Sequence, residues 1–465
     1  MPYSARPDRV TGSPTSEARV VGLLVLGLLL LTGLIVQPWK GAQPPSRYLL
    51  TVAAVDDHSL ELDPYEDLLD IDRAEYRGHV YSDKAPYQPL LAAVPFQAYR
   101  LAGGDTFPDR DPDRGLSSDG NVGLWWVTLW SCALPAIGFV LVLRRLVGQV
   151  APEVATVVAL AVLVGTVMLP FSSLLFGHVL AALFVALAWR LLRPTEASTR
   201  SVLLGGVCLG LGIGTEYTVA AVALVLLVDR LLRWERAPIV ALCAGTVLGV
   251  LPMLAYNWLV FEDPFEVSYQ GHLPNFQGEG ALGVYNLELP RWEEVSKALV
   301  GNRGLFVLTP VVLLAVLGCG WLARRAGPLR RDGVIGLIVL VLMLVLSTGI
   351  DGYGGSSPGP RYLIPMFALL AIPLAVVWQR VPRVAAAAAL VGAAVMWSAS
   401  VTSPLIDTRE PDALGLWLRW LGEGRWAPNI LTGTSGGWVL AVASALGAAA
   451  LLAAVAIERR GQAIQ

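Results

Sequence analysis

The sequence contains 465 residues, of which 55% are hydrophobic and only 15% are charged, against about 25% charged residues in an average soluble domain. So few polar residues cannot coat a soluble globule of this size, and the composition therefore excludes an ordinary cytosolic enzyme. The formal net charge of −2 gives no support for nucleic-acid binding. The four cysteines lie in apolar runs without a partner at metal-ligand spacing, so neither a zinc site nor a disulfide framework is predicted.

Long apolar runs recur along the whole chain, and about 20 such residues suffice to cross a bilayer core. They predict an all-α, polytopic transmembrane bundle with about 10–12 crossings. The clear predicted spans are Val20–Val36, Leu124–Leu143, Val154–Leu169, Leu174–Leu192, Ile239–Val260, Leu305–Leu322, Val334–Leu346, Tyr362–Val377, Val384–Val401 and Trp438–Ile457.

The distribution of Lys and Arg predicts the orientation, because short cytoplasmic loops are enriched in both. Basic clusters recur at Arg144–Arg145, Arg193–Arg200, Arg230–Arg236, Arg324–Arg331, Arg380–Arg383 and Arg459–Arg460. The other connections are acidic. We therefore expect one integral domain, 20–457, in the cytoplasmic (inner) membrane, between cytoplasmic tails 1–19 and 458–465. Its outer segments are 37–120, 261–303, 350–361 and 402–436, and the active face is outside.

Two apolar stretches do not fit this plan as simple crossings. With Arg200 and Arg230 both inside, Leu203–Val228 is expected to form a hairpin of two short helices. Leu90–Leu101 is re-entrant or interfacial, or else one of the neighbouring predicted spans is wrong.

The first outer segment carries the acids that are best placed for chemistry. Arg47–Val55 has the apolar spacing of a helix that lies along the membrane surface. Carboxylates just above the bilayer can accept a proton from an attacking hydroxyl, and Lys84 would place a cation where a lipid phosphate lies. The alternative is a solvated acidic loop in which Asp residues form turns. The residues concerned are Asp56, Asp57, Asp63, Asp70, Asp72, Tyr81, Asp83 and Lys84.

A glycine-rich outer loop runs from Asp351 through Tyr353 to Tyr362. Its backbone can approach a ligand closely, and Arg361 opens the next span with a planar guanidinium that matches phosphate. The alternative is an interfacial arginine that extends toward lipid headgroups.

Two ionisable residues, His178 and Glu216, lie within apolar surroundings. Such groups are costly at membrane depth and usually face a cavity. Glu216 is either functional or stabilises a helix break. His178 is either functional or a hydrogen-bonded histidine between helices. Tyr256, Asn257 and Tyr269 could contact a sugar acceptor, but they equally suit an interfacial aromatic belt.

Four blocks of the sequence, Tyr81–Pro86, Phe176–His178, Gly210–Tyr217 and Gly354–Tyr362, resemble the GT-C superfamily of polytopic glycosyltransferases, which includes protein O-mannosyltransferases and the aminoarabinose transferase of lipid A. The resemblance implies inverting transfer of a sugar from a polyprenyl-phosphate donor on the outer face. It also implies a carboxylate base in the first outer loop and a phosphate contact at Lys84.

The chain departs from that superfamily at three positions. Where relatives often carry an Asp-Glu pair before an arginine, residues 42–47 hold no acid before Arg47. The base is then another carboxylate: Asp63 is the first choice because Pro64 would fix its turn, and Asp56 and Asp57 are alternatives. His178 stands where many relatives have Asp, and Glu216 where several have Lys.

The leading hypothesis is a membrane glycosyltransferase that acts on a cell-envelope glycan, lipid or protein. Lys84, Arg361 and Arg47 would bind the donor phosphate, and Asp83, His178, Glu216, Tyr353 and Tyr81 would line a substrate pocket under the acidic segment. A divalent cation could bind Asp70 and Asp72, and no other cofactor is predicted. The alternatives are a transporter or flippase of a lipid-linked or anionic solute, and a GT-C-like protein without catalysis.

Overall fold

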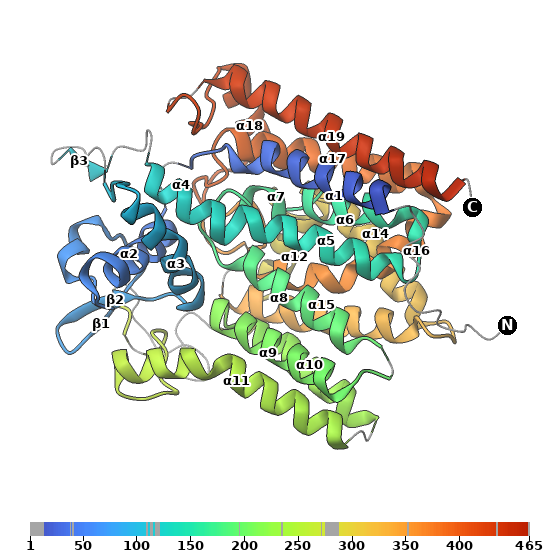
Figure 1. The fold of residues 1–465 in the computed structure, drawn as a ribbon, viewed down its shortest axis with the longest axis horizontal. Coiled ribbons are helices and arrows are strands. Elements are labelled where there is room, and N and C mark those ends of the chain that lie inside the picture. Colours follow the sequence, from blue (N-terminus) through green and yellow to red (C-terminus); the bar gives the residue numbers. More distant parts are fainter. Residues whose placement is uncertain are drawn as a thin grey trace.

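The protein is described by a computed structural model covering residues 14–463, except 38, 40, 108–109, 112–114, 117–120, 195, 234–235, 271, 275–287, 351–352 and 434–435. The described residues form a bundle of helices with a small group of elements, α2, α3, β1 and β2, at one end (Figure 1). The helices are α1 (Pro14–Leu28), α2 (Gln43–Val52), α3 (Tyr87–Leu101), α4 (Val122–Thr128), α5 (Leu134–Gly148), α6 (Ala155–Val164), α7 (Met168–Phe171), α8 (His178–Leu192), α9 (Thr199–Thr215), α10 (Val219–Leu232), α11 (Arg236–Phe261), α12 (Trp292–Val300), α13 (Leu305–Leu308), α14 (Pro310–Ala323), α15 (Arg330–Ile350), α16 (Phe367–Arg380), α17 (Pro382–Val401), α18 (Ala413–Gly422) and α19 (Gly437–Ala463).

Short turns of other helical types and two small hairpins complete the described elements. The π-helical turns are η1 (Leu29–Gly33), η2 (Ala53–Asp57) and η4 (Leu129–Ala133), and the 3-10 turns are η3 (Asp63–Leu68), η5 (Pro152–Val154) and η7 (Arg361–Met366). The hairpins pair β1 (Arg73–Tyr76) with β2 (His79–Ser82) and β3 (Arg110–Asp111) with β4 (Gly115–Leu116), both antiparallel.

The prediction of an all-α, polytopic membrane protein is confirmed. Within the described residues, seven helices are long and apolar enough to cross a membrane, or eight if a bent pair forms one span. Three shorter apolar helices are Pro152–Val164, His178–Leu192 and Thr199–Thr215. The seven are Ser16–Gly33, Val122–Gly148, Pro238–Phe261, Arg330–Ile350, Arg361–Arg380, Pro382–Val401 and Gly437–Gly461.

Two predicted spans are wrong as continuous helices. Leu305–Leu322 is split between α13 and α14, and the helices on the two sides of the break meet at 102°; Pro310 has no N–H to continue α13. Val154–Leu169 ends as a helix at Val164, because Gly165 packs directly on the backbone of α17, where a Cβ on Gly392 would lie 2.2 Å from the Gly165 carbonyl oxygen. A ten-residue helix extends only about 15 Å, half of a bilayer core.

The predicted hairpin at Leu203–Val228 is confirmed as α9 and α10, with the break at 216–218. Arg230, near the end of α10, donates to the carbonyl of Leu192 at the end of α8. The end of α10 therefore lies beside the end of α8, as a hairpin requires. Glycines of α9 and α11 face each other: a Cβ on Gly210 would lie 2.7 Å from the Cα of Gly249. This close approach of small residues is a common way to pack helices in membranes, and it fixes the end of α9 that carries Glu216.

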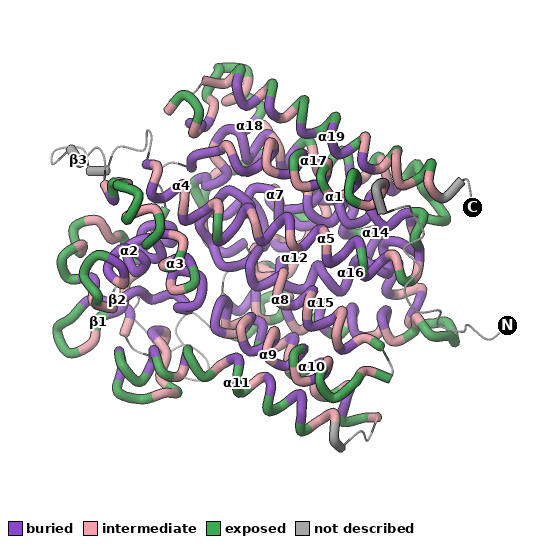
Figure 2. The backbone as a smooth tube through the Cα atoms, in the orientation of Figure 1, coloured by how far each residue is buried: buried purple, intermediate pink, exposed green. Residues whose placement is uncertain are grey.

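Apolar side chains cover the outside of the bundle. Figure 2 shows exposed residues along α11 and α19, whereas the central helices are mostly buried. On α11 the exposed large apolar residues are Val240, Val247, Leu248, Leu251, Trp258 and Leu259. Such a face suits lipid.

The predicted first outer segment is folded into helices and a β-hairpin. Arg47–Val55 is helical, as predicted, in α2 and η2, and all ten residues of α2 are buried against the rest of the protein. The β1–β2 hairpin, which sequence analysis did not predict, turns at Arg77 and Gly78, both with positive φ, as in the tight turns that suit hairpins. The ambiguous stretch Leu90–Leu101 belongs to α3, which lies beside α2 (Figure 1). It exposes Val94 and Leu101, as an interfacial helix would.

Candidate active site

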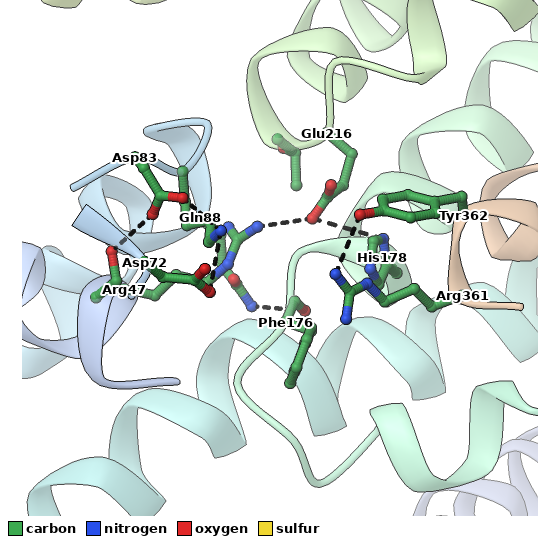
Figure 3. Close-up of polar contacts among 12 residues, drawn as sticks. Arg47, Asp72, Asp83, Gln88, Phe176, His178, Glu216, Arg361 and Tyr362 are labelled. Atoms are coloured by element: carbon green, nitrogen blue, oxygen red, sulfur yellow. Dashed lines mark hydrogen bonds and ion pairs between the residues drawn. The ribbon is translucent and has the colours of Figure 1, made fainter. Parts of the chain in front are cut away.

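Charged residues from four distant parts of the sequence meet where the predicted outer segment joins the bundle. Arg47 lies on α2, His178 is the first residue of α8, Glu216 follows α9, and Arg361 begins η7. Arg47 Nη2 lies 2.7 Å from Glu216 Oε1, and His178 Nδ1 lies 3.5 Å from the same oxygen. In Figure 3 the side chains of Arg47, His178, Glu216 and Arg361 point toward one another. We call these four residues the central cluster.

The backbone at Gly177 makes the central cluster possible. A Cβ at this position would lie 2.5 Å from Glu216 Oε1 and 3.2 Å from Arg47 Nη1. Any other residue would therefore push into the ion pair. Glu216 itself has extended backbone angles (φ −147°, ψ 115°), so its side chain leaves the axis of α9 and reaches Arg47.

Several nitrogen atoms of the central cluster are buried without a hydrogen-bond partner among the described residues. They are Nε and Nη1 of Arg47, Nε of Arg361 and both ring nitrogens of His178. Arg361 donates from Nη2 to the Tyr362 hydroxyl at 3.1 Å and stacks over Phe176 at 5.4 Å. No carboxylate of the described residues forms an ion pair with Arg361. Buried donors of this kind are rare in folded proteins and mark a place where an anion would bind favourably.

Lys84 lies in a second group of charges and is fully paired there. Its Nζ is 2.7 Å from Asp83 and 3.0 Å from Asp72. Asp83 also accepts from Ser46 at 3.3 Å. Burial lowers the pKa of Lys84, but Asp72 and Asp83 outweigh it and hold that pKa above its ordinary value. Burial raises the pKa of Asp83 to about 6, although Lys84 acts in the opposite direction.

The two groups adjoin each other. Asp72, which binds Lys84, also acts electrostatically on Arg361, as does Glu216. The side chains of Tyr217, Tyr269, Arg361 and Tyr362 remain partly exposed, so the region is open to the surface. The structure thus places Lys84, Arg361 and Arg47 near Asp83, His178 and Glu216, which the sequence analysis had grouped as phosphate contacts and pocket residues. It also places Asp72 there, which the sequence analysis had assigned with Asp70 to a possible metal site.

Arg303 holds the loop that presents Arg361. Its guanidinium is buried and donates to the carbonyl oxygens of Gly355 (3.1 Å), Ser357 (2.9 Å) and Thr408 (3.1 Å). Within the same loop Gly354 has φ +80°, and a Cβ there would lie 2.9 Å from Arg361 Nε. Tyr353 belongs to this support: Arg303 lies 4.5 Å over its ring. The predicted start of the loop, Asp351, lies outside the described residues.

Other predicted site residues lie away from the central cluster and have local partners. Asp56 binds Arg100 and Thr106, and Asp57 accepts from Tyr65. Asp63 binds His79 at 2.7 Å and the amide of Val80. Within the described residues, none of these three acids contacts the central cluster. Asp70 is exposed. Tyr81 is buried on β2, and its ring packs against that of Phe261.

A divalent cation stays a prediction. Asp72 faces Lys84 rather than Asp70. The described residues contain one group of three side chains with ligand atoms within 4.8 Å of one another, Glu61, Asp63 and His79, on the outer surface. Exposed acidic groups of this kind are common without a metal.

Sequence analysis missed several residues of the site. Arg303, Gly177 and Tyr362 were not singled out, although Arg303, like Arg361, stands just before an apolar run. Tyr269, which was assigned to an acceptor contact or an aromatic belt, lies 3.4 Å from Lys84 Nζ. The sequence marked Tyr269 as a candidate contact residue, but it could not indicate that its partner is Lys84, 185 positions away.

Comparisons of the fold found similar proteins where sequence comparisons did not. No protein-family model and no curated protein matches the sequence. The crystal structure of ArnT from Cupriavidus metallidurans bound to undecaprenyl phosphate is similar at TM-score 0.54, with 14% identity over 97% of this chain and 78% of that one. Its apo form gives 0.52, with 14% identity over 96% and 75%. Arabinosyltransferase EmbB from Mycobacterium smegmatis gives 0.43, with 14% identity over 100% and 42%. At this identity the similarity to ArnT establishes a shared fold.

Proposed function

We propose that this chain, which has the fold of the GT-C membrane glycosyltransferases, transfers a sugar from a polyprenyl-phosphate donor to a cell-envelope acceptor. The fold confirms the resemblance that the sequence indicated. The donor class is supported by the undecaprenyl phosphate bound to ArnT. The acceptor in this proposal is a glycan, lipid or protein at the outer face of the cytoplasmic membrane.

One observation carries the proposal: Arg361 and Arg47 converge with unpartnered donors in a partly buried place. When a sugar leaves its carrier, the bond from the anomeric carbon to the phosphate oxygen breaks and negative charge grows on the phosphate. Fixed guanidinium groups stabilise that charge more in the transition state than in the donor. Arg361 is available for this because no carboxylate of the described residues forms an ion pair with it.

Lys84 has a different role in this proposal from the one the sequence analysis gave it. Two carboxylates already compensate its charge, so its attraction for a phosphate is reduced. We assign to Lys84 the support of the segment that carries Asp72 and Asp83, and to Arg361 and Arg47 the contact with phosphate.

The outer location rests on the arrangement of basic residues. Arg193, Arg230 and Arg331 meet at one end of the bundle, where Arg230 and Arg331 both donate to the carbonyl of Leu192. The central cluster lies at the start of α8, and these arginines lie at its end. If basic loop ends are cytoplasmic, the central cluster is at the outer leaflet.

Binding of the carrier lipid tests the phosphate site. Arg361→Gln in the purified protein should weaken binding of undecaprenyl phosphate about 10- to 100-fold, because a charge-assisted hydrogen bond contributes about 1.5–3 kcal/mol. Arg409→Gln is the control, because Arg409 is exposed in a predicted outer segment and should leave affinity unchanged. Equal binding by the wild type and Arg361→Gln would contradict the assignment.

Product analysis tests the reaction. Mass spectrometry of envelope glycans in a strain lacking this chain should show a sugar missing that returns with the wild-type chain and not with Arg361→Gln. Movement of a lipid-linked solute across proteoliposomes without a covalent product would instead establish a transporter. Bound undecaprenyl phosphate with neither result would establish a GT-C-like protein without catalysis.

A further inference from the structure

We propose that Glu216, assisted by His178, is the general base that accepts the proton of the acceptor hydroxyl. This inference rests on the proposed function and names a residue from the α9–α10 break rather than from the first outer segment. It answers the question that the missing acid before Arg47 raises, namely which carboxylate does the work.

Only three carboxylates of the described residues reach the charged groups of the site: Asp72, Asp83 and Glu216. Asp83 cannot serve, because Lys84 and Ser46 engage its two oxygens and its side chain is only 1% exposed. Both of its oxygens are therefore committed to holding the outer segment together. Within the described residues, Asp72 and Glu216 each use one oxygen in their ion pairs, so both keep a second oxygen for a proton.

The geometry of Glu216 suits proton transfer. Arg47 and His178 both approach Oε1, and Oε2 makes no hydrogen bond with the described residues. Oε2 is not among the fully buried polar atoms, and the side chain keeps 11% of its surface exposed. Arg47 thus fixes the carboxylate through one oxygen and leaves the other for an incoming hydroxyl. A general base must first lie within hydrogen-bond distance of the proton that it removes; only then does its basicity matter.

His178 distinguishes Glu216 from Asp72. Asp72 faces the ammonium group of Lys84, which can only donate. Glu216 faces an imidazole whose two nitrogens are buried and make no hydrogen bond within the described residues. Leaving such a group unpaired costs free energy, and its retention is explained if a ligand or a transferred proton engages it. Imidazole can both accept and donate, so from 3.5 Å its Nδ1 can donate to Glu216 Oε1 and orient the carboxylate with Oε2 toward the acceptor hydroxyl.

The step balances with the groups present. The acceptor oxygen forms a bond to the anomeric carbon, and the bond from that carbon to the phosphate oxygen breaks. The electron pair stays on the lipid phosphate, beside Arg361. The hydroxyl proton moves to Glu216 Oε2. Because Glu216 lies between Arg47 and the group of His178, Arg361 and Tyr362 (Figure 3), the base and the phosphate contacts share one small region.

Glu216→Gln is the central test, with undecaprenyl phosphate binding and product formation measured separately. Membranes from the strain lacking this chain, carrying each variant, supply the native donor and acceptor, and mass spectrometry follows the product over time. Glu216→Gln should bind undecaprenyl phosphate at least as tightly as the wild type, because a negative charge beside Arg47 is removed. Its rate of product formation should fall at least about 100-fold, the usual contribution of a general base. Glu216→Asp should restore part of that rate.

Matched variants separate chemistry from folding. Glu66→Gln is the control, because Glu66 also pairs with an arginine, Arg73 at 2.9 Å, but on the exposed outer surface; its rate should be unchanged. His178→Gln should lower the rate about tenfold, and His178→Gln combined with Glu216→Gln should be no slower than Glu216→Gln alone, as expected for residues that act as a unit.

The outcomes distinguish this inference from the proposed function. If the wild type neither binds undecaprenyl phosphate nor restores a product, the proposed function fails. If the wild type does both and Glu216→Gln keeps a rate close to that of the wild type, only the inference fails. Loss of the product in Asp72→Asn with a normal rate in Glu216→Gln would assign the base to Asp72.

Discussion

The acids on the outer surface and the charges of the central cluster differ in where their partners come from. Asp57 and Asp63 bind residues 8 and 16 positions away, and their side chains face solvent. Arg47 and Glu216 are 169 positions apart and almost fully buried. Exposed ion pairs contribute little because water screens them, whereas buried charges persist only with partners. The many acids of the first outer segment therefore led the sequence analysis to predict a base among exposed residues. The few buried charges carry the proposed chemistry instead.

The largest effect on stability is expected when one partner of the buried Arg47–Glu216 pair is removed. Arg47→Met leaves Glu216 without its counter-charge, and we expect a loss of about 3–5 kcal/mol in the free energy of unfolding. Arg47→Met combined with Glu216→Gln should recover most of that loss, because no charge then stays unpaired. Unfolding in detergent measures both. If the double variant is as unstable as Arg47→Met, packing by the arginine stem rather than charge pairing dominates.

Arg303 tests whether the central cluster depends on its supporting loop. Arg303→Gln should weaken undecaprenyl phosphate binding about tenfold, because three carbonyl contacts that hold the loop before Arg361 are weakened. In an Arg361→Gln background the same change should have little further effect, since it acts through Arg361. Binding measurements on the four proteins check this. Effects that simply add would show that Arg303 contributes general stability only.

The pH dependence of stability should have opposite signs for Asp83 and Asp63. Burial raises the pKa of Asp83 to about 6, above its unfolded value near 3.9, so its contribution to stability falls as pH rises from about 4 to 6. For Asp63, slight burial raises the pKa, but the Val80 amide and His79 lower it by more. Its contribution is therefore present above about pH 4 and is lost as pH falls through its lowered pKa.

Melting temperatures of Asp83→Asn and Asp63→Asn, each compared with the wild type from about pH 2 to pH 7, check these signs. The advantage of the wild type over Asp83→Asn should shrink as pH rises, and its advantage over Asp63→Asn should shrink as pH falls. The same slope for both variants would show that the two environments do not differ as described.

The smallest effect on the reaction rate is expected at Asp63, which the sequence analysis favoured as the base. Asp63→Asn should leave the rate of product formation within about twofold of the wild type, because Asp63 is exposed and bound to His79. A loss of about 100-fold with normal folding would place the base on the outer surface and contradict the assignment to Glu216.

The sequence predicted much of the bundle because long apolar runs and basic clusters are local signals. The hairpin of α9 and α10 followed from the positions of Arg200 and Arg230, together with the length of the apolar stretch and its interruption around Glu216. The breaks at Gly165 and Pro310 were missed because the residues on both sides of each are apolar. Pro310 was a visible signal for a break, whereas the close backbone contact at Gly165 cannot be seen in the sequence. The residues of the central cluster were named one by one, but their pairing depends on contacts across more than a hundred positions. No spacing within the sequence indicates that Arg47 binds Glu216, or that Arg303 supports the loop of Arg361.

A structure of this protein determined with undecaprenyl phosphate tests the central claim most directly. The account predicts the lipid phosphate within about 3 Å of the guanidinium nitrogens of Arg361 and Arg47, beside Glu216. A phosphate bound at Lys84 alone, or at the basic loop ends on the opposite side of the bundle, would contradict it.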